Sequence, residues 1–130
     1  METTKVITPY FEDGVFAGVR VCVGDEDFVI APKDYNNGEK MTWRKAMAAL
    51  KADRLSTFNY RQICLTMAYR KEVDKMLKDN GGDVLDHYYW TCAECLTPCS
   101  FSYNGYYGTL NVYTKNLSYS IRPIKNLKEE

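Results

Sequence analysis

The chain has 130 residues, with 17 Lys or Arg balanced by 17 Asp or Glu, so its formal net charge is zero. This length suits one compact domain with a buried core. The balanced charge offers no basic surface for nucleic acid, and no apolar run is long enough for a transmembrane helix. We therefore expect a single domain over 1–130, with its core at about 6–124 and a charged, frayed tail at 125–130.

The N-terminal segment Met1–Lys5 is polar and leads into only a short apolar stretch. A secretory leader needs a longer apolar region and a small-residue cleavage site, so we expect no signal peptide. The five cysteines are an odd number, which without a leader favours free thiols over a disulfide framework.

The first predicted elements form a β-hairpin. Val15–Val23 alternates apolar residues with smaller or polar ones, which is the two-residue period of a half-buried strand. The polar turn Gly24–Asp27 follows, and Phe28–Ala31 returns as the second strand. Pro32–Glu39 is expected to be a loop, because it contains the turn sequence Asn-Asn-Gly.

Two helical segments come next. Thr42 is the expected N-cap of a helix over Trp43–Asp53, whose apolar residues are spaced for one buried face. Thr57 is expected to cap a second helical region that runs to about Asn80. The pair Gly81-Gly82 would end it, since glycine readily adopts the left-handed backbone found there.

The C-terminal third changes to the pattern of short strands. Tyr88–Thr91, Phe101–Tyr103, Thr109–Thr114 and Tyr119–Ile124 are predicted strands, separated by turn residues such as Asn104-Gly105. An N-terminal hairpin, two helical segments and C-terminal antiparallel strands with loops indicate the α+β class.

Tyrosine is the unusual residue of this chain. There are eleven, and seven of them lie between positions 88 and 119. Tyr with Ser, Asn and Gly is the composition of a binding surface, because Tyr gives amphipathic contact area at low entropic cost. The alternative is that Tyr is simply a good strand former. We expect Tyr89 and Trp90 in the core. The tyrosines expected to form an exposed contact surface are Tyr103, Tyr106, Tyr107, Tyr113 and Tyr119.

The cysteines suggest two weaker alternatives. Cys92 and Cys95, with Cys99 and His87, have the residue types of a Cys3His zinc site, and the first two have redox spacing. A zinc ribbon normally brings a second such pair, and a redox pair normally opens a helix. The acidic turn at 25–27 is better explained as a solvated hairpin turn than as a calcium site. We therefore expect no metal, cofactor or catalytic residue.

Five ordered segments carry a resemblance to a known family. They are Gly38–Trp43 with Ala46, Arg54–Thr57, Gly81–Asp83, Tyr89–Glu94 and Ile121–Ile124. Together they resemble short bacterial domains of unknown function with a C-type-lectin-like fold, which share it with formylglycine-generating enzymes and with the variable proteins of diversity-generating retroelements. The resemblance extends from Val15 to Ile124. It departs from the family at Leu55-Ser56-Thr57, usually Leu-Pro-Thr, and at Thr91–Glu94, usually Ser-Ser-Thr-Glu.

The resemblance implies a scaffold that displays side chains from its C-terminal strands and loops. In the retroelement proteins such positions are diversified, and that origin is a hypothesis for this chain. Trp90, Glu94, Gly108, Lys115, Ser118 and Arg122-Pro123 would be the fixed framework. The implied ligand-binding residues are Cys92, Cys95, Leu96, Pro98, Cys99, Ser102, Asn104, Tyr106, Tyr107, Thr109, Asn111, Tyr113, Thr114, Asn116, Leu117 and Tyr119.

The sequence thus predicts a non-catalytic, receptor-type or adhesion-type protein that binds a protein or glycan on another surface. One alternative is a structural or virion component that uses the same surface for self-assembly. A minor alternative is a cysteine-based enzyme or a zinc-binding domain, since formylglycine-generating enzymes use cysteines in a groove. The site of action stays open between the cytoplasm and display on a phage particle.

Overall fold

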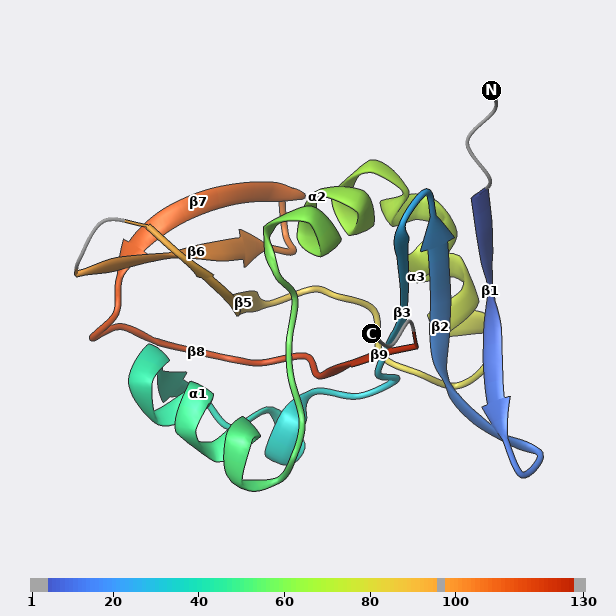
Figure 1. The fold of residues 1–130 in the computed structure, drawn as a ribbon, viewed down its shortest axis with the longest axis horizontal. Helices are drawn as coiled ribbons and strands as arrows, with labels where there is room; N and C mark the ends of the chain where they lie inside the picture. The colour runs from blue at the N-terminus through green and yellow to red at the C-terminus, as the bar shows by residue number, and fades with distance from the viewer. Residues whose placement is uncertain (1–4, 96–97, 128–130) are drawn as a thin grey trace.

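The computed structural model describes residues 5–95 and 98–127 and has the predicted α+β class (Figure 1). The described strands form a four-stranded sheet in the order β1-β2-β3-β9, a three-stranded sheet in the order β5-β6-β7, and the pair β4-β8. The strands are β1 (Lys5–Glu12), β2 (Val15–Val23), β3 (Glu26–Ile30), β4 (Met41–Thr42), β5 (Tyr88–Glu94), β6 (Cys99–Asn104), β7 (Thr109–Thr114), β8 (Ser118–Tyr119) and β9 (Ile124–Asn126). The helices are α1 (Trp43–Ala52), α2 (Tyr60–Ala68) and α3 (Arg70–Asp79), and a short 3-10 helix covers Tyr35–Gly38.

The four-stranded sheet contains the predicted hairpin and two strands, β1 and β9, that the sequence pattern did not indicate. β2 and β3 pair antiparallel, with Val21 opposite Phe28, which confirms the hairpin. β1 pairs with β2 on the side opposite to β3, although β1 contains Pro9. Proline is compatible with a strand at the edge of a sheet, and it interrupts the alternation that would otherwise mark this strand.

The C-terminal end completes the same sheet. β9 pairs with β3 and places Ile124 opposite Ile30 and Asn126 opposite Phe28. The prediction of a frayed tail from residue 125 onward is therefore wrong for Lys125 and Asn126. Both are exposed and polar, so only their backbone pairing with a strand far away in the sequence reveals them as part of the fold.

α1 forms where the apolar spacing predicts it. Its buried residues are Ala46 and Leu50, one turn apart. Thr42 precedes the helix as expected, but its hydroxyl makes no capping hydrogen bond in the described structure. None of the described helices is both long enough and apolar enough to cross a membrane.

The second helical region begins later than predicted and is divided. Asn59 Oδ1 accepts a hydrogen bond from Gln62 N at 2.8 Å, and Gln62 Oε1 accepts one from Asn59 N at 2.9 Å. This reciprocal capping box starts α2, so the prediction of Thr57 as the cap is wrong. The Thr57 hydroxyl instead donates to Arg122 O at 2.7 Å. The chain leaves helical geometry at Tyr69, which separates α2 from α3.

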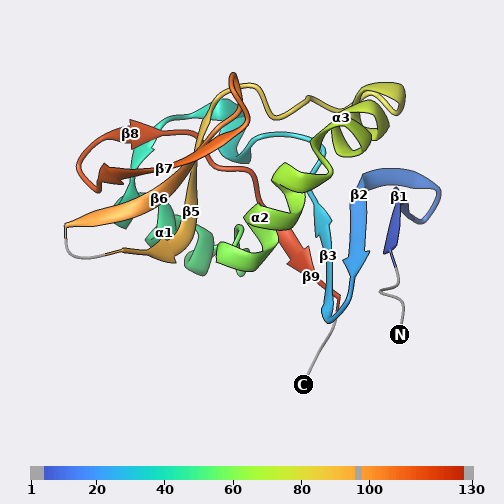
Figure 2. The ribbon, with the colours of Figure 1, turned by 90° about the horizontal axis from the view of Figure 1, so that it is seen from above.

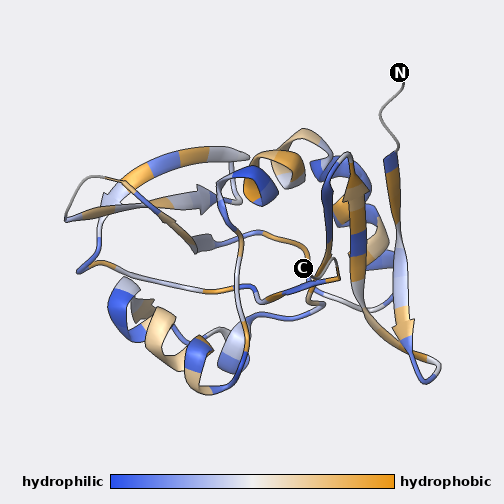
Figure 3. Ribbon diagram, viewed as in Figure 1, coloured by the Kyte–Doolittle hydropathy of each residue, from blue (hydrophilic) through white to orange (hydrophobic). Residues whose placement is uncertain are grey.

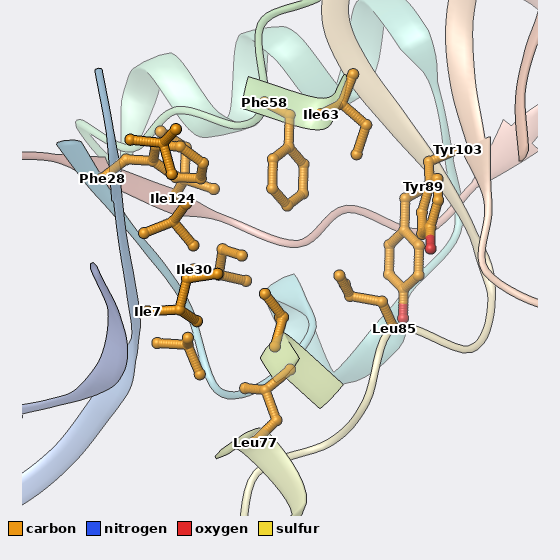
Figure 4. Packing of buried hydrophobic residues seen from close by; sticks show 14 residues of the cluster. Ile7, Phe28, Ile30, Phe58, Ile63, Leu77, Leu85, Tyr89, Tyr103 and Ile124 are labelled. Carbon is orange, nitrogen blue, oxygen red and sulfur yellow. The ribbon is translucent and has the colours of Figure 1, made fainter. Parts of the chain in front are cut away.

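The main core lies between the four-stranded sheet, α2, α3 and one face of the three-stranded sheet (Figure 4). Phe28 and Phe58 meet edge to face, with ring centroids 6.5 Å apart. Tyr89 and Tyr103 stand side by side at the opposite end of the cluster, next to Leu85. The main core therefore joins the two sheets through α2 and α3.

A second core joins α1 to the three-stranded sheet. Trp90 is fully buried and packs with Met41, Ala46, Leu50 and Ile121. Its indole Nε1 donates to Met41 O at 3.0 Å, which satisfies the one polar atom of the ring. Apolar and hydrophilic residues alternate along the turns of α1, as expected for a helix with one buried side (Figure 3).

The segment from β8 to β9 crosses the middle of the molecule (Figure 1). One continuous strand was predicted over Tyr119–Ile124, but the residues between Tyr119 and Ile124 make backbone bonds to several other segments. Ser120 bonds to β5, Ile121 O accepts from Tyr35 N, and Pro123 O accepts from Ala31 N. Proline also has no N–H for a ladder, so this segment connects the sheets without extending one strand.

Arg122 lies at the centre of this crossing segment and its side chain is 0% exposed. Its Nε donates to Asp34 Oδ1 at 2.9 Å. Nη1 donates to the carbonyl oxygens of Ala31 at 3.1 Å and Asp83 at 2.8 Å, and Nη2 donates to that of Val84 at 3.3 Å. A buried guanidinium is tolerated only when it is paired and hydrogen-bonded in this way.

Replacing Arg122 by Met should lower the free energy of unfolding by about 3–5 kcal/mol, because it leaves the partly buried Asp34 carboxylate and three carbonyls without their donor. Urea denaturation followed by circular dichroism measures this loss. Lys75→Met at the exposed Lys75–Asp79 pair is the matched control and should leave stability almost unchanged. Equal effects of the two variants would contradict a central role for Arg122.

Candidate functional site

The three-stranded sheet has two different faces, because neighbouring residues of a strand point to opposite sides. Cross-strand partners share a face, and the register places Tyr89 opposite Tyr103 and Tyr103 opposite Leu110. These three residues pack in the main core. The opposite face, which we call the tyrosine face, carries Tyr88, Trp90, Ser100, Ser102, Asn104, Thr109, Asn111 and Tyr113.

Four tyrosines on this side are connected by ring contacts through Tyr88, and we call Tyr88, Tyr106, Tyr113 and Tyr119 the tyrosine cluster. The ring centroid of Tyr88 lies 5.2 Å from that of Tyr119, 5.9 Å from that of Tyr106 and 6.1 Å from that of Tyr113. Tyr88 and Tyr119 are stacked with their planes 22° apart, whereas Tyr113 meets both rings edge to face. Stacked and edge-to-face pairs each contribute about 0.5–1.5 kcal/mol beyond area burial.

Exposure differs across the cluster. Tyr106 is 59% exposed, whereas Tyr88, Tyr113 and Tyr119 are half-buried. Tyr119 covers the buried Trp90, with ring centroids 4.9 Å apart. Burial, and then the neighbouring Tyr113 and Tyr88, raise the pKa of the Tyr119 phenol above its ordinary value. The hydroxyl therefore stays protonated at neutral pH and can donate a hydrogen bond.

The turn between β6 and β7 positions Tyr106. Asn104 Oδ1 accepts a hydrogen bond from Tyr106 N at 2.9 Å, and Gly105 N donates to His87 O at 2.8 Å. A Cβ at Gly105 would stand 2.2 Å from Leu85 O, so only glycine fits this close approach. The turn consequently lies against the chain before β5, which brings the Tyr106 ring to 6.4 Å from that of His87.

The tyrosine face gathers part of the predicted binding set. Its members in this region have exposed or half-buried side chains, and all are uncharged. They come from β7, the β6–β7 turn and β8, so the fold unites residues from separate elements. These members are Tyr106, Thr109, Asn111, Tyr113 and Tyr119.

Three residues that were predicted to be exposed are buried. Tyr103 is 0% exposed in the main core, so its assignment to the exposed tyrosines is wrong. Ser102 is also fully buried, and its hydroxyl donates to Tyr89 O at 3.0 Å. Asn104 is 4% exposed and holds the β6–β7 turn through its amide oxygen. Since β6 is the middle strand, its side chains on the tyrosine face are covered by neighbours, and we leave Ser102 and Asn104 out of the site.

The rest of the predicted set lies away from the tyrosine cluster. Tyr107 is 78% exposed but borders a hollow beside the start of α3 together with Arg70. Thr114 follows Tyr113 in β7 and so points to the opposite face. Leu96 lies outside the described residues. The other members lie near the end of β5, at the start of β6 or in the turn after β7, and they are Cys92, Cys95, Pro98, Cys99, Asn116 and Leu117.

One central residue of the cluster was not predicted. Tyr88 is the only cluster member with a ring contact to each of the other three among the described ring pairs. The signal was present in the run Tyr88-Tyr89-Trp90, because strand alternation places Tyr88 and Trp90 on one face and Tyr89 on the other. The prediction placed Tyr89 and Trp90 together in the core and assigned Tyr88 to neither face.

A group of polar contacts holds the three-stranded sheet where β5 and β7 end. The Lys115 ammonium contacts Glu94 Oε2 at 2.5 Å and lies 4.2 Å from the centre of the Trp43 ring. The Lys115 side chain is only 6% exposed, so its charge requires these partners. Trp43 in turn donates its Nε1 hydrogen to Thr91 O at 2.9 Å. These contacts fix the ends of β5 and β7 against the start of α1.

The cysteines do not assemble into a metal site within the described part of the chain, where no three His, Cys, Asp or Glu side chains converge. Cys92 is exposed as a residue, but its Sγ points back toward Thr57 O at 3.7 Å, and the partial burial of the sulfur raises the pKa of this thiol. A thiol with a raised pKa is less ionised at neutral pH and is a weaker nucleophile. His87 lies with its ring against Tyr89 and Tyr106.

No protein-family model matches this sequence, and no curated protein matches it either.

The graded exposure of the tyrosine cluster predicts unequal effects on stability. Tyr106→Ala should change the free energy of unfolding by less than about 0.5 kcal/mol, because the ring is largely solvent-exposed. Tyr119→Ala should cost about 2–3 kcal/mol, since it uncovers Trp90 and removes the stacking on Tyr88. Urea denaturation of both variants measures the difference, and equal losses would contradict the packing described above.

The environment of Cys92 predicts slow alkylation. At pH 8, iodoacetamide should modify Cys92 more slowly in the folded protein than in the same protein unfolded in urea, because the raised pKa keeps the thiol protonated. Peptide mass spectrometry over a time course measures both rates. Fast, selective labelling of Cys92 in the folded protein, or stoichiometric zinc in protein purified without added metal, would support the cysteine-based alternatives instead.

Proposed function

We propose that this protein is a non-catalytic ligand-binding domain with a C-type-lectin-like fold, and that it binds a protein or glycan on another surface through the tyrosine face. The observation that carries the proposal is the tyrosine cluster itself. Four rings from β5, the β6–β7 turn, β7 and β8 form one continuous, partly exposed patch. The fold proposal is supported by the order of the elements, with helices in the middle of the chain and antiparallel strands in its C-terminal third.

The chemistry of the face favours binding over catalysis. Its exposed and half-buried members are Tyr, Thr and Asn, which offer aromatic contact area and neutral hydrogen-bonding groups. Tyr106 supplies the most exposed ring, and Thr109 and Asn111 provide a hydroxyl and an amide on the same face. The half-buried Tyr113 and Tyr119 are already fixed by packing, so little side-chain entropy is lost when a ligand contacts them. A neutral, aromatic face of this kind suits a neutral protein or carbohydrate surface.

The structure of the tyrosine face also reduces the number of positions that we propose to be variable. Five residues of the types found at diversified positions, namely Tyr, Thr and Asn, have exposed or half-buried side chains at the tyrosine face, although Tyr113 and Tyr119 also pack against the second core. We therefore propose that any diversification acts on these positions rather than on Ser102 and Asn104, whose side chains hold β6 and its turn. The five positions are Tyr106, Thr109, Asn111, Tyr113 and Tyr119.

Binding can be tested with two matched double variants. Tyr106→Ala/Thr109→Arg alters the tyrosine face, and Tyr107→Ala/Thr114→Arg makes the same chemical changes at exposed positions away from it. Binders would be selected from a phage-displayed library of 12-residue peptides and from a glycan array, using the wild-type protein. We expect the first variant to lose at least about tenfold in affinity for the selected binders and the second to retain it, since charge and lost ring area act only on the tyrosine face.

The outcome is checked against folding by circular dichroism and thermal unfolding of each variant. Equal loss of binding in both double variants, with folding intact, would contradict the tyrosine face as the site. Selected binders that ignore the first variant would also contradict it.

The proposed diversification has a genetic test. The DNA around the gene should contain a reverse transcriptase and a near-copy repeat of the codons for residues 89–124. Differences between the two copies should fall at the five exposed positions of the tyrosine face. A gene without such a repeat would exclude diversification and would leave the binding proposal to be judged by the variants above.

A further inference from the structure

β7 forms an open edge of the three-stranded sheet. In the order β5-β6-β7 only β6 pairs with it in the described part of the chain, and β7 is the outermost strand at the top of Figure 1. The view from above shows the same sheet set apart from the four-stranded sheet, with α2 between them (Figure 2). An open strand edge presents unpaired N–H and C=O groups that can pair with another strand.

The strand β1, at one edge of the four-stranded sheet, carries features that discourage such pairing. It contains Pro9, charged residues at both ends, Lys5 and Glu12, and a register irregularity between Tyr10 and Phe11. Proline, charge and bulges are the usual means by which proteins protect an edge strand. The sequence of β7 is Thr-Leu-Asn-Val-Tyr-Thr, with no proline and no charge, and its register with β6 is regular throughout.

The register identifies the backbone groups at the open edge. Lys115 N donates to Pro98 O at 2.9 Å, which continues the β6–β7 pairing by one residue. Because hydrogen-bonding direction alternates along a strand, Thr109, Asn111 and Tyr113 point their backbone groups toward β6. Leu110, Val112 and Thr114 therefore point theirs outward.

The outward-pointing backbone groups of Leu110 and Val112 are the ones best placed to form hydrogen bonds with a second strand. Thr114 O already accepts a hydrogen bond from Leu117 N at 3.2 Å within its own turn. The side chains of Leu110 and Val112 lie on the face opposite to the tyrosine face, and Val112 is 43% exposed. The edge therefore offers two apolar side chains together with four backbone groups.

We propose that the β7 edge pairs with the β7 edge of a second copy of this chain, antiparallel, about a twofold axis that passes beside Asn111. In this register Leu110 of each copy stands opposite Val112 of the other, and each of these two pairs exchanges two backbone hydrogen bonds. Apolar side chains meet apolar side chains, Asn111 meets its own symmetry mate, and no charges of like sign are opposed. A neutral strand with this self-complementary order suits its own copy better than a charged peptide.

The pairing would join two three-stranded sheets into one of six strands. A twofold axis perpendicular to the sheet keeps each tyrosine face on the same side, so the dimer would present two tyrosine clusters together. Two linked sites bind a repetitive surface more strongly than one, because the second binding event becomes intramolecular. The dimer itself does not rest on the proposed ligand function and is measured without a ligand.

The first test removes the outward N–H of Val112. Val112→Pro should weaken dimerisation at least about tenfold in sedimentation-velocity experiments, because both symmetric pairs lose a donor while the bonds to β6 remain. Val112→Thr keeps the N–H and a β-branched side chain, and should dimerise within a few-fold of the wild-type protein. Circular dichroism establishes that each variant is folded.

The second test checks the register and does not depend on proline. Leu110→Lys and Val112→Glu should each weaken the homodimer, and an equimolar mixture of the two should restore a heterodimer, because lysine and glutamate then stand opposite each other. A wild-type protein that stays monomeric up to about 1 mM, a concentration at which even weak association (Kd about 1 mM) is visible, overturns the proposal. So does a dimer that neither Val112→Pro nor the charged variants weaken, since its interface would lie elsewhere.

Discussion

The buried guanidinium of Arg122 is the contact on which the arrangement of the two sheets depends. It comes from the segment that crosses the molecule, and it binds Asp34 and Ala31 after β3 and the carbonyls of Asp83 and Val84 before β5. It also lies 5.7 Å from the centre of the Tyr89 ring, which belongs to β5. A charge with 0% exposure must keep all of these partners, so one side chain fixes where the three-stranded sheet starts relative to the four-stranded sheet.

Once β5 is held in this way, strand alternation divides the tyrosines into two groups with different roles. Tyr89 and Tyr103 point into the main core, whereas Tyr88 and Tyr113 point to the tyrosine face. The same residue type occurs in both groups because its ring is apolar and its hydroxyl can donate a hydrogen bond. In the main core the Tyr89 hydroxyl donates to Asp34 Oδ2 at 3.5 Å, whereas the buried Tyr103 hydroxyl has no partner among the described residues. The buried indole of Trp90 packs against the ring of Tyr119, so Trp90 links the tyrosine cluster to the buried residues beneath it. The proposed binding surface and the core are therefore adjacent layers of aromatic side chains.

The neutrality of this sheet has two consequences. The tyrosine cluster and its neighbours Thr109 and Asn111 are uncharged, which suits a neutral ligand surface, and the β7 edge carries no charge either, which leaves it without the usual protection of an edge strand. Charged residues lie outside this group, in exposed pairs such as Lys75–Asp79 on α3, or at the end of the sheet, where the buried Lys115 pairs with the exposed Glu94. Recognition and self-association would then use different parts of one sheet, its face and its edge.

The sequence by itself determined the elements that depend on neighbouring residues. The alternation in Val15–Val23 and Thr109–Thr114 and the helical spacing after Thr42 predicted β2, β7 and α1, and the apolar run at 89–90 predicted buried rings. Only the tertiary structure decided which tyrosines face solvent, because that depends on the registers that bury Tyr103 and expose one face of β5 and β7. It also decided the pairing of β9 with β3 and the partners of Arg122, which is 88 positions from Asp34. A local sequence pattern depends on a few neighbouring residues. These contacts join segments that are far apart in the sequence, and neither segment contains a pattern that identifies its partner.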